Sequence, residues 1–212
     1  MRLLSEELQL SQLITGPDFA LGRQRGGDLE ALRALGAELG FRVDVIDMVR
    51  EEQADGEAKV SSSDIRGALA RGDIDRVNDL LGRRFTLHGP VVTGFERGRT
   101  IGFPTANIAV GADRALPAAG VYATLALIDG VWQQSVTNIG VRPTFDDSEA
   151  VSVECHVLDY DGDLYGRDLR ISLWGRLRGE VKFDGIEALK AQLARDCDDA
   201  RALLVSGVAN AP

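Results

Sequence analysis

The sequence contains little cysteine and histidine, and it has no long apolar run. Its 212 residues include only Cys155 and Cys197, which are too few for a disulfide framework and suit a reducing cytoplasm. No apolar run is long enough to span a bilayer, and the N-terminal residues show no hydrophobic signal region. We therefore expect a cytoplasmic protein that has no membrane partner.

Positive charge is also scarce, because 24 basic residues stand against 33 acidic ones, giving a formal net charge of −9. The acidity is spread evenly, with 11 basic and 16 acidic groups in residues 1–83 and 13 and 17 in residues 84–212. This balance argues against a nucleic acid as the main partner. An anionic ligand would have to be held locally, by backbone amides, a metal ion or a few arginines.

Residues 1–83 combine helix and strand patterns and predict a mixed α/β segment. Leucines recur at helical spacing from Leu29 to Leu39. Ser61 and Asp73 are suited to cap two short helices, the second of which would end at Gly82. Strands are expected at 10–14 and 41–46, and the polar stretch 50–59 is expected to be an exposed loop.

Short alternating strands follow from Arg84, so the domain boundary is expected between residues 1–83 and 84–212. The dipeptide Asp129-Gly130 is typical of a type I′ hairpin turn, and a second strand pair is expected around residues 159–163. Such strands followed by an amphipathic helix favour a closed barrel with a helix packed against it. The strands are expected at 86–92, 121–128, 131–137, 151–158 and 168–174, and the apolar helix face contains Ile186, Leu189, Leu193, Cys197 and Ala200.

Residues 91–107 form the segment most suggestive of chemistry. Gly94, Gly98 and Gly102 permit a loop whose backbone approaches a ligand closely, with N–H groups available to phosphate oxygens. Thr105 and Asn107 are two apart on an extended segment, so their oxygens would share one side and could bind Mg²⁺. The alternative is a glycine-bearing hairpin loop followed by a polar strand. The segment is not a Walker A loop, because no Gly-Lys-Ser/Thr follows.

Four motifs follow one another in the second part of the chain: GFPTAN at 102–107, NIGVRPTF at 138–145, VECH at 153–156 with DGDLYG at 161–166, and LRGEVKF at 177–183. Together they give the sequence a specific resemblance to riboflavin kinases. The resemblance covers roughly residues 83–204 and implies a six-stranded Greek-key β-barrel with a long terminal helix. It also implies that the protein binds ATP, Mg²⁺ and riboflavin.

The resemblance assigns roles to individual residues. Glu154 matches the catalytic base, and Thr105 and Asn107 match the positions that hold Mg²⁺ with ATP. From its alternation alone, Glu154 is better explained as an outward residue on a half-buried strand, and the motif is what favours the catalytic role. A lone histidine such as His156 is more often a structural residue. Solvated surface charges are an alternative for Arg178 and Glu180. The implied ATP-binding residues are Gly94, Gly98, Arg99, Gly102, Phe103, Pro104, Thr105 and Asn107, and the flavin-binding residues are Asn138, Arg142, Arg178 and Glu180.

The front segment resembles the second half of an FMN adenylyltransferase domain through residues 16–28 and 60–66. The His-x-Gly-His site of that family is absent, because the only histidines are His88 and His156. We therefore expect residues 1–83 to be an incomplete, truncated nucleotidyltransferase-like α/β segment, with self-association through it as a further expectation.

These features together make the chain an α+β protein in two parts and predict a riboflavin kinase, which forms FMN and ADP from riboflavin and Mg–ATP. One alternative is a fragment of a bifunctional FAD synthetase that has lost its adenylyltransferase activity. Another is a flavin-binding module without catalysis, against which the presence of Thr105, Asn107 and Glu154 argues.

Overall fold

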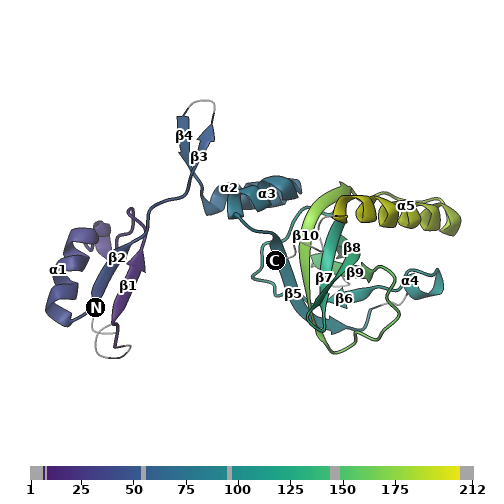
Figure 1. Ribbon diagram of the computed structural model, residues 1–212, viewed down its shortest axis with the longest axis horizontal. Helices are drawn as coiled ribbons and strands as arrows, with labels where there is room; N and C mark the ends of the chain where they lie inside the picture. The colour runs from purple at the N-terminus through teal and green to yellow at the C-terminus, as the bar shows by residue number, and fades with distance from the viewer. Residues whose placement is uncertain (1–6, 8, 54–55, 95–96, 144–148, 206–212) are drawn as a thin grey trace. The chain divides into compact units, whose positions relative to one another are not determined.

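The computed structural model describes residue 7 and residues 9–53, 56–94, 97–143 and 149–205 (Figure 1). The chain divides into two compact units, Met1–Ser61 and Ser62–Pro212. The sequence predicted the boundary some twenty residues later, after Arg83. The difference lies in two helices, which pack with the barrel of the second unit. Among the described residues, no helix is both long and apolar enough to cross a membrane.

The first unit contains a strand–helix–strand arrangement. Strands β1 (Gln12–Thr15) and β2 (Arg42–Val45) pair in parallel, and α1 (Leu29–Leu39) connects them after the short helix η2 (Arg23–Arg25). The Asp28 carboxylate accepts a hydrogen bond from the Ala31 amide at 2.9 Å and caps the start of α1. Gly40 ends the helix in the left-handed conformation, with φ of 81°. Sequence patterns therefore located all three elements to within two residues at each end.

A second feature of this unit was not predicted. Residues 50–59 form an antiparallel hairpin of β3 (Arg50–Gln53) and β4 (Gly56–Lys59), with Arg50 opposite Lys59. The expectation of an exposed loop is therefore wrong. Both strands are polar on each face, so no alternation of apolar residues reveals them.

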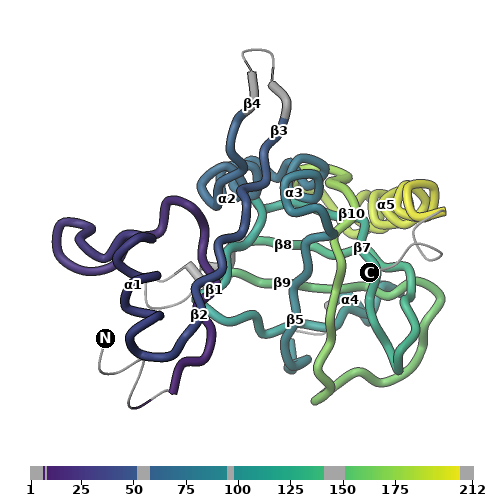
Figure 2. The backbone as a smooth tube through the Cα atoms, turned by 60° about the vertical axis from the view of Figure 1, so that its left-hand side comes forward, coloured from purple at the N-terminus to yellow at the C-terminus, as the bar shows by residue number. Residues whose placement is uncertain are grey.

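Helices α2 (Ser62–Arg71) and α3 (Ile74–Leu81) belong to the second unit (Figure 2). As predicted, the Asp73 carboxylate caps α3 by accepting from the Arg76 amide at 3.2 Å, and Gly82 ends it in the left-handed conformation. The buried Asn78 amide joins α3 to the barrel, because it donates to the Leu173 carbonyl at 3.2 Å and accepts from the Phe85 amide at 2.8 Å. The apolar residues Ala68, Leu69, Ile74 and Val77 pack into the core of the barrel.

Six antiparallel strands close into the predicted barrel. They are β5 (Phe85–Val92), β6 (Ala106–Ile108), β7 (Gly120–Ile128), β8 (Val131–Pro143), β9 (Glu149–Val157) and β10 (Asp168–Arg178). Around the barrel the order is β10-β5-β6-β9-β8-β7, so β7, β8 and β9 form a meander and β10 returns beside β7 as in a Greek key.

The predicted pairing of the last two strands with each other is wrong. Strand β9 pairs with β6 and β8, whereas β10 pairs with β5 and β7, because closure of the barrel overrides the local turn signal.

The hairpin between β7 and β8 has the predicted turn. Asp129 and Gly130 have φ of 50° and 80°, as the two central positions of a type I′ turn require. Strand β7 is apolar almost throughout, because one of its faces lines the barrel interior and the other lies under a helix.

The covering helix is α5 (Ile186–Leu204), which lies along the outside of β7, β8 and β10. The predicted apolar face of α5 is only partly correct. Cys197 and Ala200 are buried and Leu189 and Leu193 are half-buried, but Ile186 is 62% exposed. The face turned to the barrel also contains Asp196, which is buried. The outer cluster consists of Val121, Ala123, Leu125, Val136, Leu158, Trp174, Cys197, Ala200 and Leu204.

The barrel interior contains a small polar group. The Thr124 hydroxyl lies 2.7 Å from the Ser135 hydroxyl and 2.8 Å from the Thr137 hydroxyl, and Cys155 is buried beside them. Burial raises the pKa of the Cys155 thiol to about 11, although hydrogen bonds with Thr137 and Ser135 lower it in part. The thiol therefore stays protonated at physiological pH and is a poor nucleophile.

We predict that Cys155 resists alkylation in the folded protein. In a Cys197→Ala chain, where Cys155 is the remaining thiol, iodoacetamide at pH 8 should label the native protein at least about 100-fold more slowly than the urea-unfolded protein, because the thiolate is rarer. Equal labelling rates would contradict the raised pKa. Because the unfolded thiol ionises first, its contribution to stability should be lost between pH 9 and about 11.

Candidate active site

A row of three polar side chains crosses the outer face of the barrel. Strand register places Asn107 of β6 and Asn138 of β8 on either side of Glu154 of β9. Glu154 is half-buried between the buried residues Val153 and Cys155, so its carboxylate faces outward. Its outward position fits the structural alternative as well, but the two amides beside it form a polar row that can bind a ligand.

The glycine loop before β6 brings its backbone close to the two predicted metal ligands. Thr105 and Asn107 are both half-buried, and Ala106 between them is buried. A Cβ on Gly94 would lie 2.2 Å from the Asn107 amide nitrogen, and one on Gly98 would lie 2.2 Å from the Phe103 carbonyl oxygen. Gly98 therefore requires glycine, because a Cβ would meet backbone, whereas a Cβ on Gly94 would force the Asn107 side chain to move.

The loop is more ordered than the sequence indicated. Residues Arg97–Thr100 form one helical turn, α4. The amide of Phe103 donates to the Gly98 carbonyl at 2.9 Å, and Gly102 adopts φ of 88°. Thr105 Oγ1 lies 3.6 Å from the position that a Gly98 Cβ would occupy.

A cavity of about 450 Å³ opens beside this loop. Arg99, Pro104 and Thr105 line it together with the segment that follows β9. The sequence motif at 161–166 lies in this segment, and its aromatic and acidic residues are the signal by which the sequence could have indicated a ligand cavity. The residues of the segment that line the cavity include Tyr160, Asp161, Asp163, Leu164 and Tyr165.

A second cavity, of about 540 Å³, lies between the loop and α5. Gly102, Phe103 and Pro104 line this cavity, whereas Thr105 lines the first. Pro104 lines both, so the loop forms a wall between them. The predicted ATP-binding residues are thus divided: five line the two cavities, Asn107 lies in the outer row, and Gly94 and Gly98 lie in the loop that packs against it.

Two of the predicted flavin-binding residues converge over Gly140. The Glu180 carboxylate lies 2.5 Å, and the Asn138 amide nitrogen 3.5 Å, from the point that a Gly140 Cβ would occupy. Asn138 also faces Glu154 across the ladder. The side chain of Arg142 lies outside the described residues, as do Thr144 and Phe145 of the same motif.

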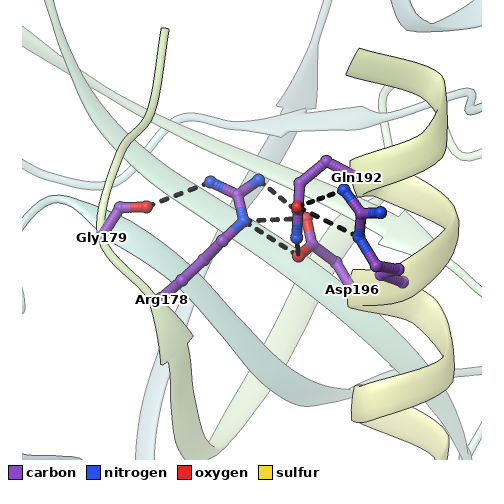
Figure 3. Close-up of polar contacts among 5 residues, drawn as sticks. Arg178, Gly179, Gln192 and Asp196 are labelled. Carbon is purple, nitrogen blue, oxygen red and sulfur yellow. Dashed lines mark hydrogen bonds and ion pairs between the residues drawn. The ribbon is translucent and has the colours of Figure 1, made fainter. Parts of the chain in front are cut away.

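Arg178, the remaining predicted flavin-binding residue, is held by α5 (Figure 3). Its guanidinium donates to both carboxylate oxygens of Asp196 at 2.7 to 3.2 Å, and Gln192 donates to the same carboxylate at 2.9 Å. The Arg178 and Asp196 side chains are 19% and 2% exposed. This bidentate pair fixes the end of β10, and with it Gly179 and Glu180, to the terminal helix.

A metal ion at Thr105 and Asn107 would need further ligands. Within the described part of the chain, no group of three or more His, Cys, Asp or Glu side chains could hold one. The two side-chain oxygens are hard donors that suit Mg²⁺, whose remaining ligands would come from phosphate and water.

The fold and the site define a closed-barrel domain with a cavity of small-molecule size and, on its outer face, a carboxylate that two amides flank. The chain belongs to the riboflavin kinase family, because the family model described as riboflavin kinase matches residues 81–204. A second model, described as FAD synthetase, matches residues 1–64. The predicted family and barrel are therefore confirmed.

Curated relatives are longer than this chain. It is 40% identical over 202 residues to the bifunctional riboflavin kinase/FMN adenylyltransferase of Pseudomonas fluorescens, covering 95% of this chain and 63% of that protein. It is 38% identical over 195 residues to the protein of the same name from Listeria monocytogenes, covering 92% and 60%. The chain thus spans about three fifths of their length.

A solved structure also resembles the chain. The crystal structure of a Streptococcus pneumoniae protein, named as a macrolide-efflux protein, aligns with a TM-score of 0.73 and 32% identity. The alignment covers 88% of this chain and 58% of that chain.

We predict that Asp196→Asn destabilises the second unit by about 3 kcal/mol, because it leaves the mostly buried Arg178 charge unpaired. Both tryptophans lie in this unit: Trp174 belongs to the outer cluster and Trp132 packs against it, so their fluorescence in urea reports its unfolding.

The matched control is Asp159→Asn, which disrupts the exposed pair with Arg201 and should cost less than about 1 kcal/mol. Equal losses in the two variants would contradict a special role of the Arg178–Asp196 pair.

Proposed function

We propose that this protein is a riboflavin kinase, which transfers the γ-phosphate of Mg–ATP to the ribityl 5′-hydroxyl of riboflavin. The observation that carries the proposal is the register that sets Glu154 between Asn107 and Asn138. A carboxylate in that position can receive a proton from a hydroxyl group, while the two amides face ligands on either side of it. Membership of the riboflavin kinase family supports the choice of substrates.

We assign the nucleotide to the first cavity. Its volume of about 450 Å³ falls within the usual range for small-molecule sites. Apolar and aromatic residues such as Leu164 and Tyr165 would contact the base, and Arg99 would face the phosphates. Thr105 and Asn107 would hold Mg²⁺ together with phosphate oxygens. When bound, Mg²⁺ would neutralise negative charge on the transferred phosphate.

The flavin then belongs on the Asn138 side of Glu154, where Glu180 also converges. The primary hydroxyl of the ribityl chain attacks the γ-phosphorus, the bond from phosphorus to the β–γ bridging oxygen breaks, and ADP leaves. Glu154 accepts the hydroxyl proton as the new bond forms. Because a primary alcohol is a weak nucleophile, the orientation of this base is the main contribution of the row.

A second activity, FMN adenylyltransferase, is favoured by the FAD synthetase match at residues 1–64 and by the names of the relatives. We propose that these 212 residues do not perform it. Residues 1–83 contain no histidine, and the described residues of the first unit form one parallel pair of short strands and one antiparallel hairpin. Transfer of an adenylyl group needs positioned donors on the ATP phosphates. Arg23, Arg25 and Arg66 could bind phosphate but would not orient the reaction.

We predict that the purified 212-residue chain converts riboflavin to FMN with Mg–ATP and makes no FAD from FMN. Chromatography of timed samples separates the three flavins, and omission of Mg²⁺ is the control for metal dependence. Absence of FMN would refute the kinase proposal and leave the alternative of a flavin-binding module. FAD formation at a rate similar to that of FMN would refute the second statement.

We predict that Glu154→Gln lowers kcat by a factor of about 10² to 10⁴ with little change in riboflavin affinity, because it removes the base and keeps the shape of the side chain. The matched control is Glu187→Gln on α5, whose carboxylate is 89% exposed and pairs with Lys190. Stopped assays and flavin fluorescence titration measure the two quantities. A Glu154→Gln enzyme with the parent kcat would remove Glu154 from the mechanism.

A further inference from the structure

His156 donates a hydrogen bond to the glycine loop that precedes β6. Its Nδ1 lies 2.7 Å from the carbonyl oxygen of Pro104. A carbonyl oxygen can only accept, so Nδ1 carries the proton and donates it. The imidazole also meets the ring of Phe103 edge-on, with ring centres 5.5 Å apart and an interplanar angle of 64°. From the sequence alone, His156 is expected to be a structural residue with no role in the site.

The bonded carbonyl belongs to the peptide group that leads into Thr105. The peptide group is planar and trans, so fixing its oxygen also fixes its N–H, which points the opposite way, and the direction in which Thr105 leaves. Proline has no N–H, so the carbonyl is the backbone group through which Pro104 can be held. The single hydrogen bond from His156 therefore orients the residue that precedes the predicted metal ligand.

The hydrogen bond reaches Pro104 from the second cavity, on the other side of the loop from the first cavity. His156 lines the second cavity, Thr105 lines the first, and Pro104 lines both. Phe103 anchors the same segment, because its side chain packs against the outer cluster and its amide bonds to Gly98. A histidine in this place can shape the nucleotide cavity without touching a ligand in it.

We propose that His156 is a positioning residue for the nucleotide half of the site: its hydrogen bond to Pro104 orients Thr105 for Mg–nucleotide binding. This inference rests on the proposed kinase function. The effect of this hydrogen bond should be selective for the nucleotide. Asn138 and Glu180 lie beyond Glu154 on the β8 side of the row, away from the loop that contains Pro104. Loss of the hydrogen bond should therefore affect the nucleotide and leave riboflavin binding almost unchanged.

The test compares His156→Phe, which keeps a ring against Phe103 but has no donor, with His156→Asn, which has an N–H at the same distance from Cβ as Nδ1. Calorimetry of the full chain with Mg–ADP should show binding about 3- to 10-fold weaker for His156→Phe, the effect of one lost hydrogen bond. The Asn variant should stay within about twofold of the parent. In turnover assays, the KM for Mg–ATP should rise by the same factor while the KM for riboflavin does not.

Two further variants complete the design. His88→Phe is the matched control, because His88 is a half-exposed histidine on β5 that faces Arg114 and Asp168, and it should change neither constant. If His156→Phe does not fold, His156→Thr, which is smaller and cannot reach Pro104, replaces it with the same expected loss.

Unchanged Mg–ADP affinity in the donor-less variants would overturn the inference, and so would an equal loss of riboflavin affinity or a failure of asparagine to restore binding. The calorimetric comparison does not depend on turnover. A parent chain that binds Mg–ADP in a His156-dependent way but does not phosphorylate riboflavin would refute the proposed function alone. A parent chain that makes FMN with a fully active His156→Phe variant would refute the inference alone.

Discussion

The antiparallel register of β6, β9 and β8 is the constraint on which the site depends. The ladder sets Asn107, Glu154 and Asn138 side by side, although they lie on three separate strands. A slip of one residue in β9 would turn Glu154 into the barrel and bring the apolar Val153 or Cys155 outward. The hydrophobic interior and the polar outer row therefore determine each other, and the site is as rigid as the barrel that carries it.

The two halves of the site are held in place by different contacts. On the β6 side, glycines allow the loop to pack directly on Asn107, and the Phe103–Pro104 segment is anchored between β9 and α5. On the β8 side, Glu180 reaches the site from the end of β10, which the buried Arg178–Asp196 pair joins to α5. The terminal helix thus supports both halves from one outer face.

Strand β9 carries two outward residues with different neighbours. Glu154 lies between the two amides of the outer row, and His156 bonds to the loop before β6. In the proposed function, chemistry at the first position and orientation at the second would be coupled by a rigid strand rather than by a flexible link.

The sequence by itself determined the local features: the extent of α1, the cap of α3, the Asp129-Gly130 turn, and the motifs that identify the family. Each depends on residues a few positions apart, whose backbone preferences act locally. Tertiary structure alone decided that β9 pairs with β6 and β8, that α2 and α3 pack with the barrel, and that Arg178 binds Asp196. These arrangements join residues far apart in the chain, and their energies come from burial and closure that no local pattern encodes.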